Sequence, residues 1–189
     1  MSTDTEVVTK KLFTTDEYHR MSELGILRED RRFELIRGEI IEMPRPGPPH
    51  SGRVNRLTRL FTSRLGDAVV VAIQNPVWLD EFSEPLPDVA LLKPRADFYT
   101  DSHPTVDETL LLIEVSDSTE NYDRKIKGPL YAEMGIPEYW QLSVKKDVLV
   151  VHTQPADGQY QSIATFKRGQ TIRLQKLPAI AFSIDEILG

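Results

Sequence analysis

Two acidic residues border apolar segments in a way that suits a hard metal cation. Asp88 follows Pro87 and adjoins the apolar run 89–92, and Glu114 directly follows the run 110–113. An acid at the exit of each of two apolar strands is how a divalent cation is usually held beside a phosphodiester, because oxygen ligands suit magnesium and rigid strands fix their separation. The two carboxylates can meet only if these strands are neighbours in one sheet. The pattern therefore indicates metal-dependent nuclease chemistry, conditional on that pairing.

A phosphodiesterase also needs a cation near the reacting phosphate, because negative charge builds up there in the transition state. The position two residues after Glu114, where a lysine is expected, holds Ser116. Lys125 and Lys127 follow on an expected helix, where about 100° per residue separates them by about 200°, so only one can face the site. We select Lys127, which shares a helical face with Tyr131 four residues later. The alternative is that both lysines are solvated.

Composition limits the class of protein. With 189 residues, 40% hydrophobic and 28% charged, the chain is typical of one globular domain, which we expect over residues 14–189 after an N-terminal tail of residues 1–13. The start is polar and acidic and no long apolar run follows, so we expect a cytoplasmic protein with no membrane partner. Because the chain has no cysteine, a metal would be held by carboxylates, carbonyls, water or one of four histidines.

One basic segment stands out in a chain of net charge -6. Residues 44–66 contain no acid, and they hold His50 with Arg45, Arg53, Arg56, Arg59 and Arg64. Four apolar residues at helical spacing predict a helix over residues 51–65, with Arg56 and Arg59 on the opposite, solvent-facing side. We interpret this basic face as a source of phosphate contacts to DNA.

The remaining pattern predicts a mixed α/β (α+β) fold. A capping box at Thr14 and Glu17 starts a helix over residues 15–24, and Arg37-Gly38 joins a hairpin of residues 33–36 and 39–42. Core strands are expected at 69–73, 89–92 and 110–115, with a surface loop at 93–108 and a helix from Ser118 or Thr119 to residue 134. The C-terminal third predicts an antiparallel meander of strands at 138–142, 148–152, 160–166 and 171–174.

Six segments in this order together resemble the Uma2 family of restriction-endonuclease-like proteins. They are residues 33–39, His50 before a helix, 87–89, 113–119, Asp123 with Lys127 and Tyr131, and 135–140. The resemblance extends from about Thr14 to the C-terminus and places the chain in the PD-(D/E)xK nuclease superfamily. It implies a restriction-endonuclease-like αβββαβ core with a mixed sheet flanked by helices. It also implies Mg²⁺ or Mn²⁺ held by Asp88, Glu114 and the Val115 carbonyl, and a lysine that in many members has moved onto the following helix.

The resemblance implies roles for further residues. Glu34 matches an early acid that orients the metal or its water, with a hairpin acid paired to Arg31 or Arg37 as the alternative. His50 matches a phosphate contact or proton shuttle, with a solvated histidine near the helix start as the alternative. Asp123 is expected to pair with Lys127 four residues later. The expected substrate-binding set is His50, Arg53, Arg56, Arg59, Ser116 and Tyr131.

Two functions follow from these residues. The first is a magnesium- or manganese-dependent DNA endonuclease in which Glu34, Asp88, Glu114 and Lys127 are catalytic. We expect it to be a homodimer, because a double-strand cut needs two sites and the meander leaves a sheet edge to cover. The second is an inactive nuclease-fold module that binds nucleic acid or a protein partner. The acidic net charge and the serine at position 116 favour this alternative.

Overall fold

The computed structural model describes residues 9–189, so residues 1–8 of the expected tail lie outside the described part. The helices are α1 (Thr15–Glu23), α2 (Pro48–Leu65), α3 (Glu120–Tyr122), α4 (Gly128–Glu133) and α5 (Ile184–Leu188). The strands are β1 (Arg32–Ile36), β2 (Glu39–Met43), β3 (Val70–Ala72), β4 (Val89–Leu92), β5 (Thr109–Ser116), β6 (Glu138–Ser143), β7 (Val148–Ala156), β8 (Gln159–Phe166), β9 (Thr171–Arg173) and β10 (Ala181–Ser183). Short 3₁₀ turns lie at Gly66–Ala68 and Val106–Glu108, and a π-helical turn at Asp123–Lys127.

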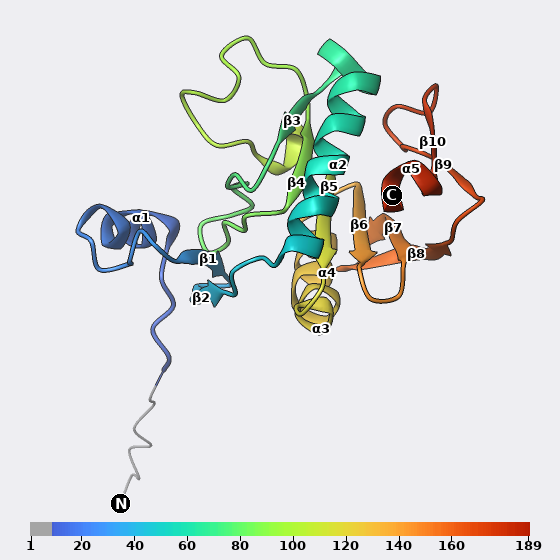
Figure 1. Ribbon diagram of the computed structural model, residues 1–189. Coiled ribbons are helices and arrows are strands. Elements are labelled where there is room, and N and C mark those ends of the chain that lie inside the picture. The colour runs from blue at the N-terminus through green and yellow to red at the C-terminus, as the bar shows by residue number, and fades with distance from the viewer. Residues whose placement is uncertain (1–8) are drawn as a thin grey trace, which may run out of the picture.

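A six-stranded mixed sheet in the order β3-β4-β5-β6-β7-β8 forms the centre of the fold. All neighbouring strands are antiparallel except β5 and β6, which run parallel and are joined through α3 and α4. Helix α2 runs along the sheet, with α1 and the β1–β2 hairpin to one side and β9, β10 and α5 to the other (Figure 1). The succession α2, β3, β4, β5, α3–α4, β6 confirms the expected αβββαβ core.

The alternation of side chains along β5 assigns its residues to opposite faces of the sheet. Leu111, Ile113 and Val115 pack in the cluster that contains the buried residues of α2. Leu112 packs in the other cluster, with Leu130 of α4. Because successive side chains of a strand point to opposite faces, Glu114 lies on the α4 face.

Helix α2 starts three residues earlier than its hydrophobic pattern predicts. Pro48 and Pro49 occupy its first turn, where a missing N–H costs nothing because that group has no partner within the helix. Its buried residues are the four predicted ones, Val54, Leu57, Phe61 and Leu65. The apolar face of α2 was therefore correctly predicted, and it anchors the helix against the sheet.

The β1–β2 hairpin lies where the sequence predicts it, and backbone contacts hold it on the core. Arg37 and Gly38 both have positive φ angles, 51° and 74°, as the tight turn requires. A Cβ atom on Gly38 would lie 2.6 Å from the Leu12 Cβ, so only glycine fits there. Leu35 exchanges backbone hydrogen bonds with Glu84, of 2.8 and 3.4 Å. These bonds fix the hairpin next to the segment that leads into β4.

The helix expected up to residue 134 is present, but its hydrogen-bond pattern changes along its length. Helix α3 is one turn, a π-helical turn follows at Asp123–Lys127, and α4 then runs from Gly128. The π turn closes with the Gly128 N–H donating to the Asp123 carbonyl, five residues back. Such wide turns are rare and occur often at functional sites.

The C-terminal strands differ from the expected four-stranded meander. Strands β6, β7 and β8 form it, but β9 pairs with β10 in a separate two-stranded sheet. The reason is packing: Phe182, Ile184 and Leu188 are fully buried in the cluster that contains α2, and the Phe182 ring lies 5.4 Å from that of Phe61. No helix in the described part of the chain is long and apolar enough to cross a membrane.

Candidate active site

Asp88 and Glu114 lie side by side, because the start of β4 is next to the end of β5 in the sheet. Val89 pairs with Ile113 in the antiparallel register, so the residues next to this pair are Asp88 and Glu114. The Val115 N–H donates to Asp88 Oδ2 at 2.9 Å. Asp88 thus lies at the entry of its strand rather than at the exit, and the antiparallel pairing is what makes an entry and an exit adjacent.

The carboxylate of Asp88 is held by hydrogen bonds from three elements. The His50 Nε2 atom, in the first turn of α2, lies 2.9 Å from Oδ2, and the Gln74 side-chain amide donates to Oδ1 at 3.1 Å. Burial alone would raise the pKa of Asp88, but the bonds from His50, Val115 and Gln74 outweigh burial and hold this pKa below its ordinary value. Asp88 is therefore ionised at neutral pH.

Lys127 reaches from the π-helical turn to two buried acids. Its Nζ atom lies 2.9 Å from Oε1 of Glu34 and 2.9 Å from Oε1 of Glu114, and the side chain is 1% exposed. The Tyr131 hydroxyl donates to the same oxygen of Glu114 at 2.7 Å. Burial would lower the pKa of Lys127, but the charges of Glu114, Glu34 and Asp123 outweigh it and raise this pKa. The lysine is accordingly a permanent buried cation.

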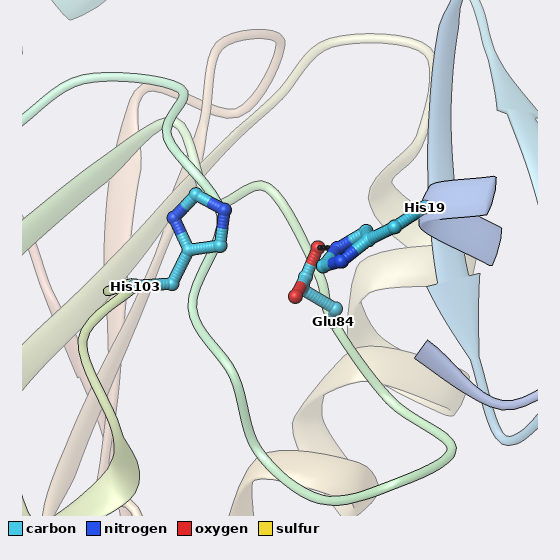
Figure 2. A group of neighbouring side chains, drawn as sticks. All are labelled: His19, Glu84 and His103. Carbon is cyan, nitrogen blue, oxygen red and sulfur yellow. Dashed lines mark hydrogen bonds and ion pairs between the residues drawn. The ribbon is translucent and has the colours of Figure 1, made fainter. Parts of the chain in front are cut away.

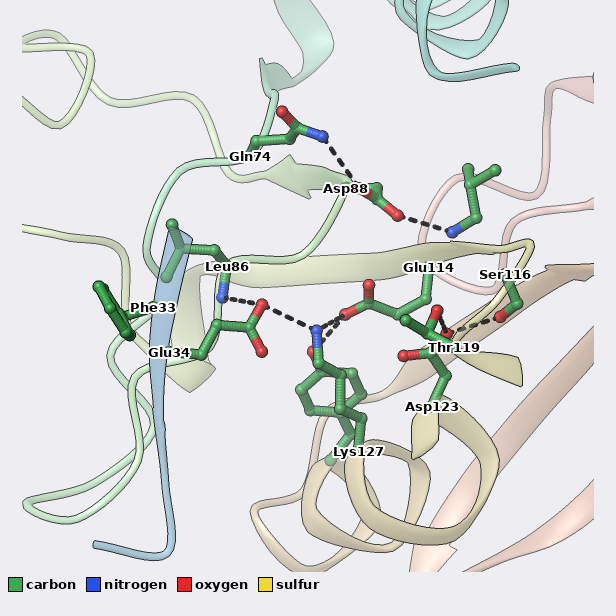
Figure 3. Close-up of polar contacts among 12 residues, drawn as sticks. Phe33, Glu34, Gln74, Leu86, Asp88, Glu114, Ser116, Thr119, Asp123 and Lys127 are labelled. Atoms are coloured by element: carbon green, nitrogen blue, oxygen red, sulfur yellow. Dashed lines mark hydrogen bonds and ion pairs between the residues drawn. The ribbon is translucent and has the colours of Figure 1, made fainter. Parts of the chain in front are cut away.

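Glu34 enters the same cluster from strand β1. Its Oε1 atom also accepts the Leu86 N–H at 3.2 Å, whereas Oε2 is buried with no hydrogen-bond partner among residues 9–189 (Figure 3). The alternative of a hairpin ion pair to Arg31 or Arg37 is wrong, since these arginines pair with Glu42 and Glu133. Glu34 thus points into the protein, toward Lys127.

Asp123 lies in the π-helical turn and faces the last residues of β5. Its Oδ2 atom accepts hydrogen bonds from the hydroxyls of Ser116, at 2.8 Å, and Thr119, at 2.7 Å. The expected ion pair between Asp123 and Lys127 is replaced by these bonds, because the ammonium extends to Glu34 and Glu114 instead. Burial raises the pKa of Asp123, and its Oδ1 atom has no hydrogen-bond partner within the described chain.

These groups line a pocket of about 50 Å³ whose charge does not balance. Five acids line it, Glu34, Asp88, Glu114, Asp117 and Asp123, against three cations, Lys127, Arg32 and Arg45. Burial raises the pKa of Glu114 well above its ordinary value; Lys127 opposes this shift, and the three neighbouring acids reinforce it. The surplus of negative charge, the oxygen donors and the two unpartnered carboxylate oxygens fit a divalent cation, which prefers such ligands.

The arginines expected to bind substrate lie away from this pocket. Arg53 pairs with Asp147 at 3.3 Å, and Arg56 and Arg59 are exposed on another part of α2, beside Glu186. Burial of the opposite face of α2 against the sheet orients these arginines outward, as the pattern predicted. It does not orient them toward the acids, so their expected phosphate contacts stay a prediction for a surface outside the pocket.

Two arginines outside the expected site set, Arg32 and Arg45, do line the pocket. Arg45 had been named only as part of the basic segment, and Arg32 was missed. Arg32 precedes Glu34 by two residues in β1, so the alternation of a strand puts both side chains on one face. That alternation was a usable signal for Arg32. Gln74, which was also missed, lies in a loop with a φ angle of 53°, and no sequence pattern indicates that its side chain meets Asp88.

Three other expected site residues do not line the pocket but contact the acids that do. The Val115 side chain is buried in the α2-side core, and only its backbone faces Asp88. Ser116 and Tyr131 are fully buried, and their hydroxyls bind Asp123 and Glu114. Neither offers surface to a substrate, so their expected role in substrate binding is replaced by one of holding the acids in place.

Known proteins share the sequence pattern and the fold of this chain. A family model named Uma2 and described as "Putative restriction endonuclease" matches residues 15–185. The chain belongs to the Uma2 family. The Uma2 protein described here also shares its fold with a crystal structure of "a putative nuclease belonging to DUF820" from Anabaena variabilis ATCC 29413. The TM-score is 0.72 at 16% sequence identity, over 93% of this chain and 97% of that one. A search of curated proteins found no match.

Proposed function

We propose that this Uma2 protein is a metal-dependent endonuclease that hydrolyses phosphodiester bonds in DNA. The observation that carries the proposal is the buried contact of Lys127 with Glu34 and Glu114, beside Asp88, in a pocket open to solvent. An ammonium and several carboxylates at hydrogen-bond distance are the groups that phosphodiester hydrolysis requires of a protein. Membership of the Uma2 family supports the same reaction.

Asp88 and Glu114 would hold Mg²⁺ or Mn²⁺ with the Val115 carbonyl. In an antiparallel pair, the N–H and C=O of one residue point to the same neighbour, so the Val115 carbonyl shares the side on which its N–H reaches Asp88. When bound, such a cation polarises the phosphoryl oxygen and makes water a stronger nucleophile. Glu34, whose Oε2 is free of hydrogen bonds within the described chain, would orient a water molecule at this site.

The protein's own groups would then act on charge and protons. Lys127 lies where it can stabilise the negative charge that develops on the phosphoryl oxygens, and Glu34 holds its ammonium in that position. The hydrogen bond between the His50 Nε2 atom and Asp88 orients the imidazole at the pocket wall for a phosphate contact or proton transfer. Tyr131 fixes the Glu114 carboxylate through its hydroxyl.

DNA would enter over Arg32 and Arg45, which line the pocket and supply positive charge next to the acids. Arg53, Arg56 and Arg59 of α2 would contact phosphates only farther along a bound duplex. The proposal includes a homodimer in the cytoplasm, with the edge strand β8 and its exposed Ile163 as the contact surface. Sedimentation of a monomer alone at micromolar concentration would contradict the dimer.

Cleavage of DNA tests the proposed reaction directly. Purified protein is incubated with supercoiled plasmid and with a duplex oligonucleotide in Mg²⁺, in Mn²⁺ and in EDTA. We expect nicked or linear product only with metal, and a loss of about 10²–10³-fold or more in Asp88→Asn. Asp107→Asn is the matched control, because Asp107 is an exposed acid in the surface loop. Equal cleavage by wild type and Asp88→Asn would refute the proposed site.

The alternative is a nuclease fold that binds nucleic acid or protein without cutting. The observation in its favour is charge: the chain carries a net charge of -6, and the acids that line the pocket, five in all, outnumber the three cations there. A protein that binds the metal and DNA, but yields no cleavage product under any of these conditions, would support this alternative. Product formation that depends on Asp88 would exclude it.

A further inference from the structure

Three potential metal ligands meet outside the acidic pocket, on the side of the molecule that carries α1. His19 comes from α1, Glu84 from the segment between β3 and β4, and His103 from the surface loop between β4 and β5. One ligand atom from each of the three lies within 4.8 Å of the others (Figure 2). The centroids of the His19 and His103 rings are 6.2 Å apart. None of the three residues lines the acidic pocket described above.

One oxygen of the buried Glu84 carboxylate has no hydrogen-bond partner among residues 9–189. The residue is 1% exposed, and His19 Nε2 lies 2.8 Å from its Oε1 atom. Its Oε2 atom is buried and has no hydrogen-bond partner in the described part of the protein. An unpaired buried carboxylate oxygen costs a protein stability, and natural structures contain few of them. Its presence here, beside two imidazoles, indicates a ligand.

The backbone holds the three side chains together without help from their own contacts. The Thr15 N–H donates to the Glu81 carbonyl at 2.8 Å, which ties the start of α1 to the segment that carries Glu84. The Trp78 N–H donates to the Pro104 carbonyl at 2.9 Å, which fixes the residue after His103 on the same segment. The cluster is therefore preorganised, as a ligand site must be if binding is to avoid a large ordering cost.

We propose that His19, Glu84 and His103 bind one transition-metal ion of the zinc class. Two imidazoles and one carboxylate suit zinc and related ions, whereas carboxylates and carbonyls alone suit magnesium and manganese. The two sites of this chain thus differ in their ligand chemistry. Three protein ligands leave a fourth position for water or another donor. The ion replaces the proton between His19 and Glu84 and links α1 to the surface loop through His103.

Calorimetric titration with zinc tests the site in the full-length, untagged protein after removal of metal. Saturating Mg²⁺ is present, so that the acidic pocket is occupied by its preferred class of ion. We expect one equivalent of zinc in wild type and an affinity about 100-fold lower in His103→Ala, which removes one of three ligands. Asp107→Ala, in the same loop, is the control and keeps the wild-type affinity. His103 is exposed, so its loss leaves the fold intact.

A thermal readout gives a second, independent measurement. Free zinc at about 100 times its Kd is expected to raise the Tm of wild type by roughly 5–10 °C and to leave that of His103→Ala almost unchanged. Glu114→Gln is expected to keep the zinc equivalent, because Glu114 belongs to the other site. Unchanged zinc affinity in His103→Ala, loss of zinc in Glu114→Gln alone, or no binding by wild type would each overturn the proposal.

Discussion

The Lys127 ammonium lies 2.9 Å from a carboxylate oxygen of Glu114, although 13 positions separate the two residues and they belong to different elements. A lysine two residues after Glu114 would have shared its strand and its face of the sheet. Ser116 holds that position and binds Asp123 instead. In this protein the cation is therefore placed by a helical turn, and the serine has become part of the support for that turn.

Replacing Lys127 should abolish cleavage while leaving metal-independent DNA binding. Lys127→Met removes the only cation bound to Glu34 and Glu114 in the described chain, so we expect at least a 10²–10³-fold loss of rate. Lys125→Met is the matched control, since Lys125 is exposed in the same turn and should retain the wild-type rate. Rates are measured as initial velocities of plasmid nicking in Mn²⁺.

The buried acids left by Lys127→Met also destabilise the fold, by about 3–5 kcal/mol for an uncompensated buried charge. Lys127→Arg is therefore measured alongside Lys127→Met. The arginine keeps the positive charge and changes only the place of that charge in the pocket. A Lys127→Met protein that is folded by circular dichroism and cuts at the wild-type rate would contradict the role given to this lysine.

Tyr131→Phe should lower stability through Glu114. The mutation removes the hydroxyl that donates to the buried carboxylate, so we expect the free energy of unfolding to fall by about 1–2 kcal/mol in urea denaturation. Tyr122→Phe is the control: the Tyr122 hydroxyl is buried with no hydrogen-bond partner in residues 9–189, so its removal should cost nothing. Equal losses in both variants would show that the hydrogen bond to Glu114 is not what stabilises the site.

Salt dependence of DNA binding should separate the pocket arginine from the helix arginine. Arg45 lines the pocket and Arg59 does not. With a duplex just long enough to cover the pocket, the slope of log affinity against log salt should decrease in magnitude by about one phosphate contact in Arg45→Gln. Arg59→Gln should keep the wild-type slope on this short duplex, because Arg59 would contact only phosphates farther along a longer one. Fluorescence anisotropy with a labelled duplex in EDTA measures both. The reverse result would restore the α2 arginines as the substrate surface.

Acid should destabilise the protein through His152, which does not line the acidic pocket. Burial lowers the pKa of His152 to about 4, from the 6.5 expected in the unfolded chain. The unfolded state thus binds the proton first, and the contribution of this histidine is complete above pH 6.5 and is lost as pH falls toward 4. The loss amounts to about 3 kcal/mol at most, at 1.36 kcal/mol per pKa unit.

Urea titrations at several pH values, in EDTA, measure this effect. His152→Gln removes the titrating group, so the free energy of unfolding should depend less on pH between 6.5 and 4 than in wild type. The surroundings of the side chain explain the expectation: the rings of Tyr139 and Tyr160 lie 5.0 and 5.6 Å from the imidazole and cannot replace water around a charge. Parallel pH curves for the two proteins would contradict it.

Local patterns predicted the acids better than the cations. Asp88 and Glu114 adjoin apolar segments that were expected as core strands. The two acids could meet only if these strands were neighbours, and the observed pairing of β4 with β5 meets that condition. The direction of Arg56 and Arg59 relative to the acids depends instead on how α2 lies across the sheet. That orientation is set by tertiary packing, which helical periodicity does not describe.

The missed parts of the fold have the same origin. The π-helical turn at Asp123–Lys127 depends on which partners the side chains find, and local propensity does not favour a five-residue turn. Strand β10 and helix α5 are three and five residues long, and their burial against α2 rather than their own pattern stabilises them. His19, Glu84 and His103 are separated by many residues and share no spacing motif, so only the folded chain reveals them.

The ion pair between Lys127 and Glu34 joins residues 93 positions apart. During synthesis, a growing polypeptide contains Glu34, Asp88 and Glu114 before it contains the lysine. Under the proposed function, an incomplete chain emerging from the ribosome has the acids but cannot assemble the cutting centre.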